Sequence, residues 1–357
     1  MTENKIKVAV MFGGRSPEYA VSLHSCASVL RSISEDKYDI LKIGITEKGK
    51  WLYYDGSIDE IDNNTWFNHD SCCEILMNTD STNNGFVKLN NNGSFEKISV
   101  DVVFPVLHGE NGEDGTVQGM CELANIPFVG CGMTSSAVCM DKEYTHAICE
   151  QAGIKTAPYM AVVEYEVEDY KKLYDEAVEK LGLPIFIKPA NLGSSHGISK
   201  IRNYDEFVEG MKYGFKYDKK QILEKTINGF EIGCAILGEA NMKIGEVDEI
   251  EMDHDFFDYE EKYNQTSTKI YLPARLNADM MEKARDMAFK TYRALRCKGL
   301  NRIDMFVSTD DNEIYLNETN TIPGFTSLSR FPSMIRVGLN MEFPELIDEL
   351  IQLAIRK

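Results

Sequence analysis

The fold is most constrained by a repeated alternation of hydrophobic, strand-forming segments with segments of helical character. Residues 7–14, KVAVMFGG, run from a strand into a glycine turn, and residues 16–33 follow as a predicted helix with Ser16 at its N-cap. Residues 38–46, YDILKIGIT, and residues 100–109, VDVVFPVLHG, predict two further strands. This alternation predicts an open α/β sheet whose functional residues lie at the strand ends.

The rest of the chain supplies more elements, and with 357 residues the chain is too long for one small core. Residues 55–97 are polar and rich in Asn and Gly, which predicts hairpins or an insertion with little core. Residues 251–269 are acidic and aromatic without a clear period, which predicts a lid-type loop. Other predicted elements are helices at 116–126, 135–153 and 279–296, and strands at 127–130, 183–190, 197–201, 221–227, 301–308 and 313–320.

Composition argues against several classes of partner. The net charge of −19 disfavours nucleic acid and anionic membranes, because both require a basic face. The sequence has no run of about 18 apolar residues, so no membrane span is expected. The N-terminus does not read as a signal peptide, and the nine cysteines contain no C-x-x-C pair. A cytoplasmic protein with buried free thiols is therefore expected, rather than one with disulfides or a zinc site.

A glycine-serine loop, GSSHG at 193–197, is a candidate phosphate site. Its backbone N–H groups and hydroxyls can surround phosphate oxygens, and Lys188 lies on the preceding predicted strand. It is not a Walker A loop, and GGRSPE at 13–18 lacks the third glycine of a dinucleotide fingerprint. On its own, such a loop is more often an ordinary hairpin turn.

Two predicted neighbouring strands carry a candidate metal site. Glu318 and Asn320 share one face because side chains alternate along a strand, and Asp304 can lie opposite them. Two carboxylates and an amide, without His or Cys, favour Mg²⁺ over zinc. A solvated acidic hairpin explains the same spacing equally well.

These motifs together resemble the ATP-grasp enzymes and, within them, the D-alanine–D-alanine ligase family. The resemblance covers nearly the whole chain and is nearest to the VanG-type D-alanine–D-serine ligases. The matching motifs are GGRSPEYAVSL, LHGENGEDGTVQG, CMDK, FIKPANLGSSHGISK, ILEKTINGFEIG, FFDYEEKY, NRIDMF and NETNTIPGFTS. It implies an N-terminal open α/β domain (1–130), a central ATP-grasp domain (131–224) and a C-terminal ATP-grasp domain (225–357) with the lid loop and metal site.

The resemblance also implies roles for individual residues. The residues implied to bind ATP are Lys142, Lys188, Ser195, Glu224, Lys225, Ile227, Glu231 and Lys262. Those implied to hold two Mg²⁺ ions, for which Mn²⁺ can substitute, are Asp304, Glu318 and Asn320. The implied catalytic residues are Glu18, Ser194, Tyr263, Arg302 and Gly324. The implied second-substrate residues are His108, Phe257, Ser329 and Arg330.

The implied reaction has two steps and takes place in a homodimer. A first D-alanine attacks ATP to give an acyl phosphate, and the amine of a second substrate then attacks that carbonyl. Arg302 and the Gly324 N–H would stabilise the oxyanion. Glu18 would bind the first ammonium and be linked to Ser194 and Tyr263.

Arg330 bears on the second substrate. Enzymes that make D-Ala–D-Ala usually have leucine at this position and tyrosine at that of Phe257, whereas D-serine ligases match this chain. An apolar pocket cannot discriminate strongly for or against one hydroxyl, whereas a charged donor contributes roughly 1.5–3 kcal/mol. Tyr263 counts against D-lactate. His196 and Leu328 depart from the usual pattern, and Leu328 puts fine acceptor specificity in doubt.

Purely structural explanations exist for several of these residues. An acidic residue such as Glu18 is favourable in a first helical turn. His108 could be a buried, hydrogen-bonded histidine, and Tyr263 could be a loop aromatic that packs on the core. Arg330 could face solvent or bind the carboxylate that every acceptor carries. Among whole functions, ordinary D-Ala–D-Ala synthesis is the main alternative. A ligase of another ATP-grasp branch, a nucleotide-binding sensor and an NAD-dependent oxidoreductase agree less well with the motifs.

Overall fold

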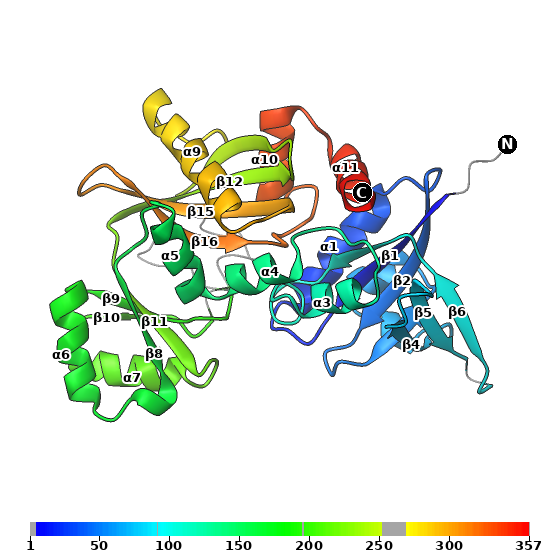
Figure 1. Cartoon of the computed structure of the whole chain (residues 1–357), viewed down its shortest axis with the longest axis horizontal. Helices are drawn as coiled ribbons and strands as arrows, with labels where there is room; N and C mark the ends of the chain where they lie inside the picture. Colours follow the sequence, from blue (N-terminus) through cyan, green and yellow to red (C-terminus); the bar gives the residue numbers. More distant parts are fainter. Residues whose placement is uncertain (1–4, 91, 195, 252–268, 357) are drawn as a thin grey trace.

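Three β-sheets, each built from one continuous part of the chain, organise the molecule (Figure 1). The computed structural model describes residues 5–90, 92–194, 196–251 and 269–356. The strand orders are β6-β5-β4-β3-β2-β1-β7, β10-β9-β11-β8 and β14-β13-β12-β15-β16. The predicted mixed α/β class is confirmed. Of the predicted domain limits, residue 130 precedes α4 and residue 224 lies within β11.

The N-terminal sheet has a parallel centre and an antiparallel extension. Its parallel strands are β1 (Ile6–Gly13), β2 (Tyr38–Ile45) and β7 (Val102–Val106). The extension consists of β3 (Trp51–Tyr54), β4 (Cys73–Asn78), β5 (Gly85–Leu89) and β6 (Phe95–Ser99), with α2 (Ile58–Asp62) and η1 (Trp66–Asn68) between β3 and β4. The prediction of little core in residues 55–97 is wrong, because Trp66 and Phe86 are fully buried. Residues 79–84, which include two asparagines, connect β4 to β5, and apolar residues on either side of them enter the core.

Two predicted elements of this region differ in the structure. Helix α1 (Tyr19–Ser32) begins at Tyr19 rather than just after Ser16. Ser16 instead closes a turn, since its Oγ accepts the Glu18 N–H and its carbonyl accepts the Tyr19 N–H. Residues 127–130 form no strand, and Phe128 makes only an isolated bridge to Val103. Helix α3 (Thr116–Leu123) agrees with its prediction.

The helix predicted at 135–153 is two helices, α4 (Met133–Met140) and α5 (Lys142–Gln151). Asp141 separates them with an extended backbone, and its carboxylate accepts the N–H groups of Glu143 and Tyr144. An aspartate that caps a new helix satisfies N–H groups that have no partner within the helix. The break makes Lys142 the first residue of α5.

The central sheet is covered by two helices, and the C-terminal sheet has helices on both faces. The central elements are β8 (Tyr159–Val163), η2 (Glu164–Glu166), α6 (Tyr170–Leu181), β9 (Ile185–Pro189), β10 (Ser199–Ile201), α7 (Tyr204–Gly214) and β11 (Lys220–Lys225). The C-terminal elements are β12 (Gly229–Gly238), β13 (Lys243–Glu251), β14 (Lys269–Tyr271), α9 (Ala278–Ala294), β15 (Gly299–Ser308), β16 (Ile314–Asn320), α10 (Arg330–Leu339) and α11 (Phe343–Ile355).

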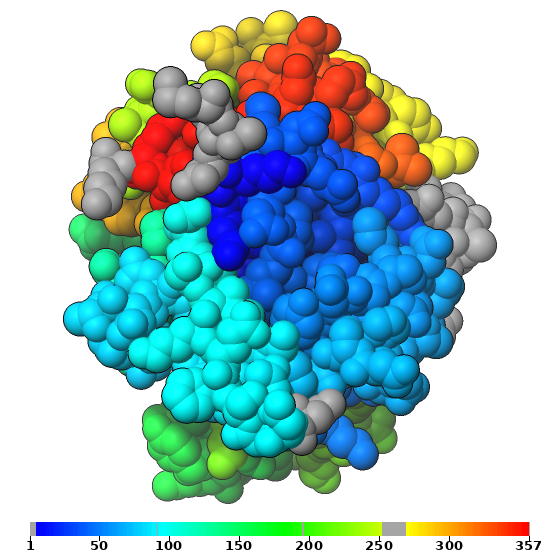
Figure 2. Space-filling view, turned by 90° about the vertical axis from the view of Figure 1, so that its right-hand side faces the viewer, coloured from blue at the N-terminus to red at the C-terminus, as the bar shows by residue number. Residues whose placement is uncertain are grey.

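The C-terminal helix α11 packs against the N-terminal part of the chain. Leu346 and Ile351 of α11 belong to the same buried cluster as Val10 and Leu30 of the N-terminal part. Tyr38 donates a hydrogen bond to Asp348 of α11, and the C-terminal residues lie beside the first strands on the surface (Figure 2). The N- and C-terminal parts therefore share a core. All nine cysteines are free thiols, and no helix among the described residues is long and apolar enough to cross a membrane.

Candidate active site

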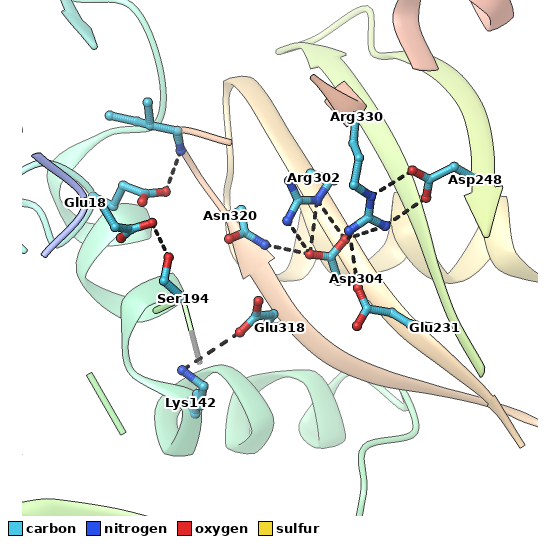
Figure 3. A network of polar contacts seen from close by, with 12 residues as sticks. Glu18, Lys142, Ser194, Glu231, Asp248, Arg302, Asp304, Glu318, Asn320 and Arg330 are labelled. Carbon is cyan, nitrogen blue, oxygen red and sulfur yellow. Dashed lines mark hydrogen bonds and ion pairs between the residues drawn. The ribbon is translucent and has the colours of Figure 1, made fainter. Parts of the chain in front are cut away.

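The hairpin of β15 and β16 brings four of the predicted site residues together. Asp304 lies opposite Glu318 and Arg302 opposite Asn320 in the antiparallel register, so the predicted hairpin is confirmed. The Nε and NH2 groups of Arg302 donate to the Asp304 carboxylate at 2.6–3.0 Å, and Asn320 Nδ2 donates to it at 2.8 Å (Figure 3). Asp304 is 1% exposed, so these donors stabilise a carboxylate that water does not reach.

The proposed metal ligands of this hairpin are all oxygen donors. Within the described residues, no group of three His, Cys, Asp or Glu side chains is arranged to hold a metal ion. Two carboxylates and one amide suit a hard cation such as Mg²⁺ that takes its remaining ligands from phosphate and water. The side chains thus fit a cation site that is completed by phosphate oxygens or water.

Arg330, the first residue of α10, has its guanidinium surrounded by carboxylates. Its Nε and NH2 groups donate to Asp248 at 2.7 and 2.8 Å, and NH1 donates to Glu231 at 3.2 Å. NH2 also lies 3.5 Å from Asp304 Oδ1. The Arg330 side chain is only 14% exposed, so the alternative in which it faces solvent is wrong. Burial opposes its charge, but Asp248 and Asp304 raise the pKa of Arg330 well above its usual value.

A glycine makes room for this guanidinium. Gly233 of β12 lies between Asp248 of β13 and Asp304 of β15 in the sheet register. A Cβ on Gly233 would lie 2.5 Å from Arg330 NH2 and 2.9 Å from an oxygen of each aspartate. We call Gly233, Asp248, Asp304 and Glu231 the arginine seat. Sequence reasoning missed Gly233 and Asp248, although a glycine inside a strand is a known sign of close approach.

The two predicted phosphate lysines are buried and face the C-terminal hairpin. Lys142 Nζ donates to the carbonyl of Leu192 at 2.8 Å and lies 4.0 Å from Glu318 Oε2. Lys188 of β9 lies 2.5 Å from Glu224 Oε2, and it donates to Asn317 Oδ1 at 3.3 Å. Buried ammonium groups require such partners. Both positive charges therefore lie at the junction of the central and C-terminal parts.

Glu224 and His146 form a buried pair beside Lys188. Burial would raise the pKa of Glu224, but the Lys188 charge holds it below its usual range, whereas burial lowers the pKa of His146. Glu224 Oε1 and His146 Nδ1 are buried and have no hydrogen-bond partner among the described residues. Glu224 Oε1 lies 3.6 Å from His146 Nε2, and buried atoms that make no hydrogen bond fit a ligand that supplies its own donors and acceptors. Lys225 is exposed and Ile227 is half-buried.

Glu18 and Ser194 meet across two parts of the molecule. Glu18 is the N-cap residue of α1, and its Oε1 accepts the Ser194 hydroxyl at 2.5 Å. Ser194 has a φ of +53°, in the left-handed region that non-glycine residues rarely adopt. On the other side of Glu18, a Cβ on Gly109 would lie 2.5 Å from Glu18 Oε2. The carboxylate is therefore confined between two loops.

His108 and Glu113 hold the backbone of a single residue of the C-terminal part, Ile322. His108 Nδ1 hydrogen-bonds the Ile322 carbonyl at 2.8 Å, and its Nε2 hydrogen-bonds Ser25 Oγ at 2.9 Å. Glu113 accepts the N–H groups of Gly109 at 2.9 Å and of Ile322 at 2.8 Å. Burial lowers the pKa of His108, and burial together with the nearby charge of Glu18 raises the pKa of Glu113 to about 8. Glu113 was not among the predicted residues, although it stands in the motif LHGENGEDG.

Of the remaining residues singled out in the sequence, some lie within the described part of the chain and four do not. Ser329 Oγ accepts the Thr326 N–H at 3.0 Å just before α10, and Gly324 is partly exposed. Leu328 is 80% exposed, and the ring of His196 stacks near Tyr217. Four predicted residues and most of the predicted lid loop lie outside the described residues: Ser195, Phe257, Lys262 and Tyr263.

Known proteins resemble this chain along almost all of its length. Residues 7–131 match the family model described as the D-ala D-ala ligase N-terminus, and residues 148–352 match that of the D-ala D-ala ligase C-terminus. The D-alanine–D-alanine ligase of Acetivibrio thermocellus is 44% identical, over 99% of this chain and 97% of that protein. The D-alanine–D-alanine ligase of Clostridium acetobutylicum is 44% identical, over 98% of this chain and 98% of that protein.

Solved structures agree in fold. The VanG D-Ala:D-Ser ligase from Enterococcus faecalis superposes with a TM-score of 0.89 at 44% identity, covering 98% of this chain and 100% of that chain. The D-alanine–D-alanine ligase from Coxiella burnetii has a TM-score of 0.84 at 29% identity, covering 98% and 95%.

Proposed function

The chain belongs to the D-alanine–D-alanine ligase family, and we propose that it is an ATP-dependent ligase that joins D-alanine to D-serine. The observation that carries the acceptor assignment is the position of Arg330, whose guanidinium lies 3.5 Å from Asp304 beside Arg302. The alternative is D-Ala–D-Ala synthesis for the ordinary cell wall. Identity does not decide between them, because relatives named for each product are equally similar, at 44%.

The proposed nucleotide site is supported by charge. A protein with a net charge of −19 binds a triphosphate only where cations are concentrated. Lys142 and Lys188 are buried, and each faces a carboxylate that a phosphate can replace as partner. Asp304, Glu318 and Asn320 would hold Mg²⁺, which when bound neutralises charge on the phosphates.

The proposed chemistry is two successive displacements. A carboxylate oxygen of the first D-alanine attacks the γ-phosphorus of ATP, and the bond to ADP breaks, which gives D-alanyl phosphate. The amine nitrogen of the second substrate then attacks the carbonyl carbon, loses a proton and expels phosphate. Glu18 would hold the first ammonium, while Arg302 and the Gly324 N–H would stabilise the oxyanion. Positioning by these residues would provide most of the rate enhancement.

Arg330 would select the acceptor through N–H groups that make no hydrogen bond within the described residues. A guanidinium carries five N–H groups, and three of them donate to Asp248 and Glu231. A D-serine hydroxyl would accept from one of the others, directly or through water. One hydrogen bond from a charged donor contributes roughly 1.5–3 kcal/mol, which corresponds to a preference of about tenfold to a hundredfold.

The test is phosphate release from ATP and Mg²⁺ with D-alanine alone and with D-alanine plus D-serine, with mass identification of the dipeptide. We expect a larger kcat/KM for D-serine than for D-alanine as acceptor, and Arg330→Leu should narrow or reverse that ratio. A clear preference of the wild type for D-alanine at neutral pH would leave the ligase assignment standing and reject the D-serine one. Asp304→Asn should remove both activities. We further expect a homodimer, which light scattering checks.

A product of D-alanine and D-serine would connect the chain to vancomycin resistance, because the family makes peptidoglycan precursors. This role follows from the product and from no single residue. Mass identification of the dipeptide therefore tests this role and the identity of the acceptor in one measurement.

A further inference from the structure

The two peptide groups that flank Ile322 are each held by a residue of the loop that follows β7. Glu113 Oε1 accepts the Ile322 N–H at 2.8 Å, and His108 Nδ1 bonds the Ile322 carbonyl at 2.8 Å. The Thr321 hydroxyl also donates to the Glu113 carbonyl at 3.5 Å. We call His108 and Glu113 the peptide clamp. It joins the N-terminal part to a segment 214 residues further along the chain.

The protons of the clamp have one consistent arrangement. A carbonyl only accepts, so His108 Nδ1 must carry the proton of this hydrogen bond. Burial lowers the pKa of His108, so the ring is neutral and its Nε2 accepts from the Ser25 hydroxyl at 2.9 Å. The Ser25 oxygen in turn accepts the Phe325 N–H at 3.3 Å. One chain of donors and acceptors therefore fixes both Ile322 and Phe325.

Gly324 lies between these two anchored residues. Pro323 has no N–H, and those of Ile322 and Phe325 are used, whereas the Gly324 N–H donates to no acceptor within the described part of the chain. Residues 321–323 and Phe325 are buried, whereas Gly324 is partly exposed. The segment thus presents one backbone donor from a frame that is fixed on both sides.

We propose that Glu113 and His108 are positioning residues that hold the Gly324 N–H in place as a donor to the reacting carbonyl. The inference rests on the proposed function, because it assumes that negative charge develops beside Gly324. It assigns Glu113 a role in the chemical step without contact to substrate. It also moves His108 from substrate contact to positioning, since both of its ring nitrogens are already bonded.

The first test is kinetic, with the full-length enzyme and with Glu110→Ala as the matched control. Glu110 is a glutamate exposed on the same loop. We expect Glu113→Ala to lower kcat about 10- to 100-fold, the size of effect that misplacement by about 1 Å produces. The KM for ATP should stay within about threefold, since the lysines that bind phosphate are untouched. Glu113→Gln retains one acceptor oxygen, so its loss should be smaller.

Coupling is the second kinetic test. His108→Ala and Glu113→Ala act on the backbone of one residue, Ile322, so the double variant should lose little more than the worse single variant. Additive losses, or a kcat of folded Glu113→Ala within about twofold of the wild type, would overturn the proposal. If Glu113→Ala does not fold, the isosteric Glu113→Gln decides by the same criteria.

Hydrogen exchange tests the clamp without using activity. In Glu113→Ala, amide exchange in a peptide spanning 321–326 should be at least about tenfold faster than in the wild type, because the Ile322 N–H loses its acceptor. Unchanged exchange there refutes the clamp even if the enzyme is active. A wild type that makes no dipeptide refutes the proposed function while the exchange result still stands.

Discussion

Arg330 lies so close over Gly233 that a Cβ on the glycine would be 2.5 Å from the guanidinium NH2 nitrogen. The contact joins the first residue of α10 to the middle of β12, and two aspartates flank it in the sheet register. A buried arginine needs both space and counter-charge. The arginine seat supplies both.

Gly233→Ala should displace Arg330 and reduce the preference for D-serine towards that of Arg330→Leu. The added methyl group also lies 2.9 Å from Asp304 Oδ1, so overall activity should fall as well. The measurement is therefore the ratio of kcat/KM for D-serine to that for D-alanine, in which a common loss cancels. Gly132→Ala is the control, since a Cβ there meets its nearest atom at 3.6 Å. An unchanged ratio would show that the position of Arg330 is irrelevant to acceptor choice.

Arg330 and Asp248 should be coupled in stability. Arg330→Leu leaves a buried carboxylate without its cation, which typically costs about 3–5 kcal/mol of unfolding free energy. Asp248→Asn should cost less, about 1.5–3 kcal/mol, because Glu231 and Asp304 still face the guanidinium. Urea unfolding of both single variants and the double variant measures the interaction. Strict additivity would contradict a direct pair.

Ser194→Ala should lower kcat/KM for D-alanine as first substrate by about 10- to 100-fold, because Glu18 loses a donor worth roughly 1.5–3 kcal/mol. The hydroxyl donates to Glu18 from a different part of the molecule, so its loss removes one of the donors that hold the carboxylate. Ser81→Ala, at an exposed turn, is the control. Equal kinetics for the two variants would show that the bond has no part in substrate binding.

Glu113 should make stability fall with rising pH. Its pKa is raised to about 8 in the fold, against about 4.3 for a free glutamate, by burial and by Glu18, while the charge of Arg302 and the bonds to Gly109 and Ile322 oppose the rise. Between these values the folded state keeps a proton that the unfolded state has lost. The unfolding free energy should therefore decrease as pH rises through about 8, by at most about 1.4 kcal/mol per pH unit.

The comparison for this pH effect is the wild type against Glu113→Gln, by urea unfolding at about pH 7 and about pH 9. His108 has a lowered pKa, so it is neutral in both states across this window and does not contribute. The difference between the two proteins should shrink or change sign at the higher pH. A constant difference would mean that Glu113 is ionised throughout.

Local pattern and motif were enough to predict most elements and the juxtaposition of several residues proposed for the site. Strand alternation places Glu318 and Asn320 on one face, and a short hairpin brings Asp304 opposite them, so sequence spacing alone indicated that juxtaposition. The same reasoning failed at Asp141, where a capping side chain divides what reads as one helix. Helix propensity has only a weak effect on where a helix begins or ends, and the capping side chain of Asp141 outweighs it.

The sequence by itself determined the α/β class, the hairpin that brings Asp304 opposite Glu318 and the lysines near a glycine-serine loop, because these depend on residues close together in the chain. Only the tertiary structure decided that Arg330 pairs with Asp248, that His108 and Glu113 hold Ile322, and that α11 completes the N-terminal core. Such contacts join segments far apart in sequence, and no local pattern encodes them. They form because a buried charge or peptide group must find a partner wherever the fold brings one within reach.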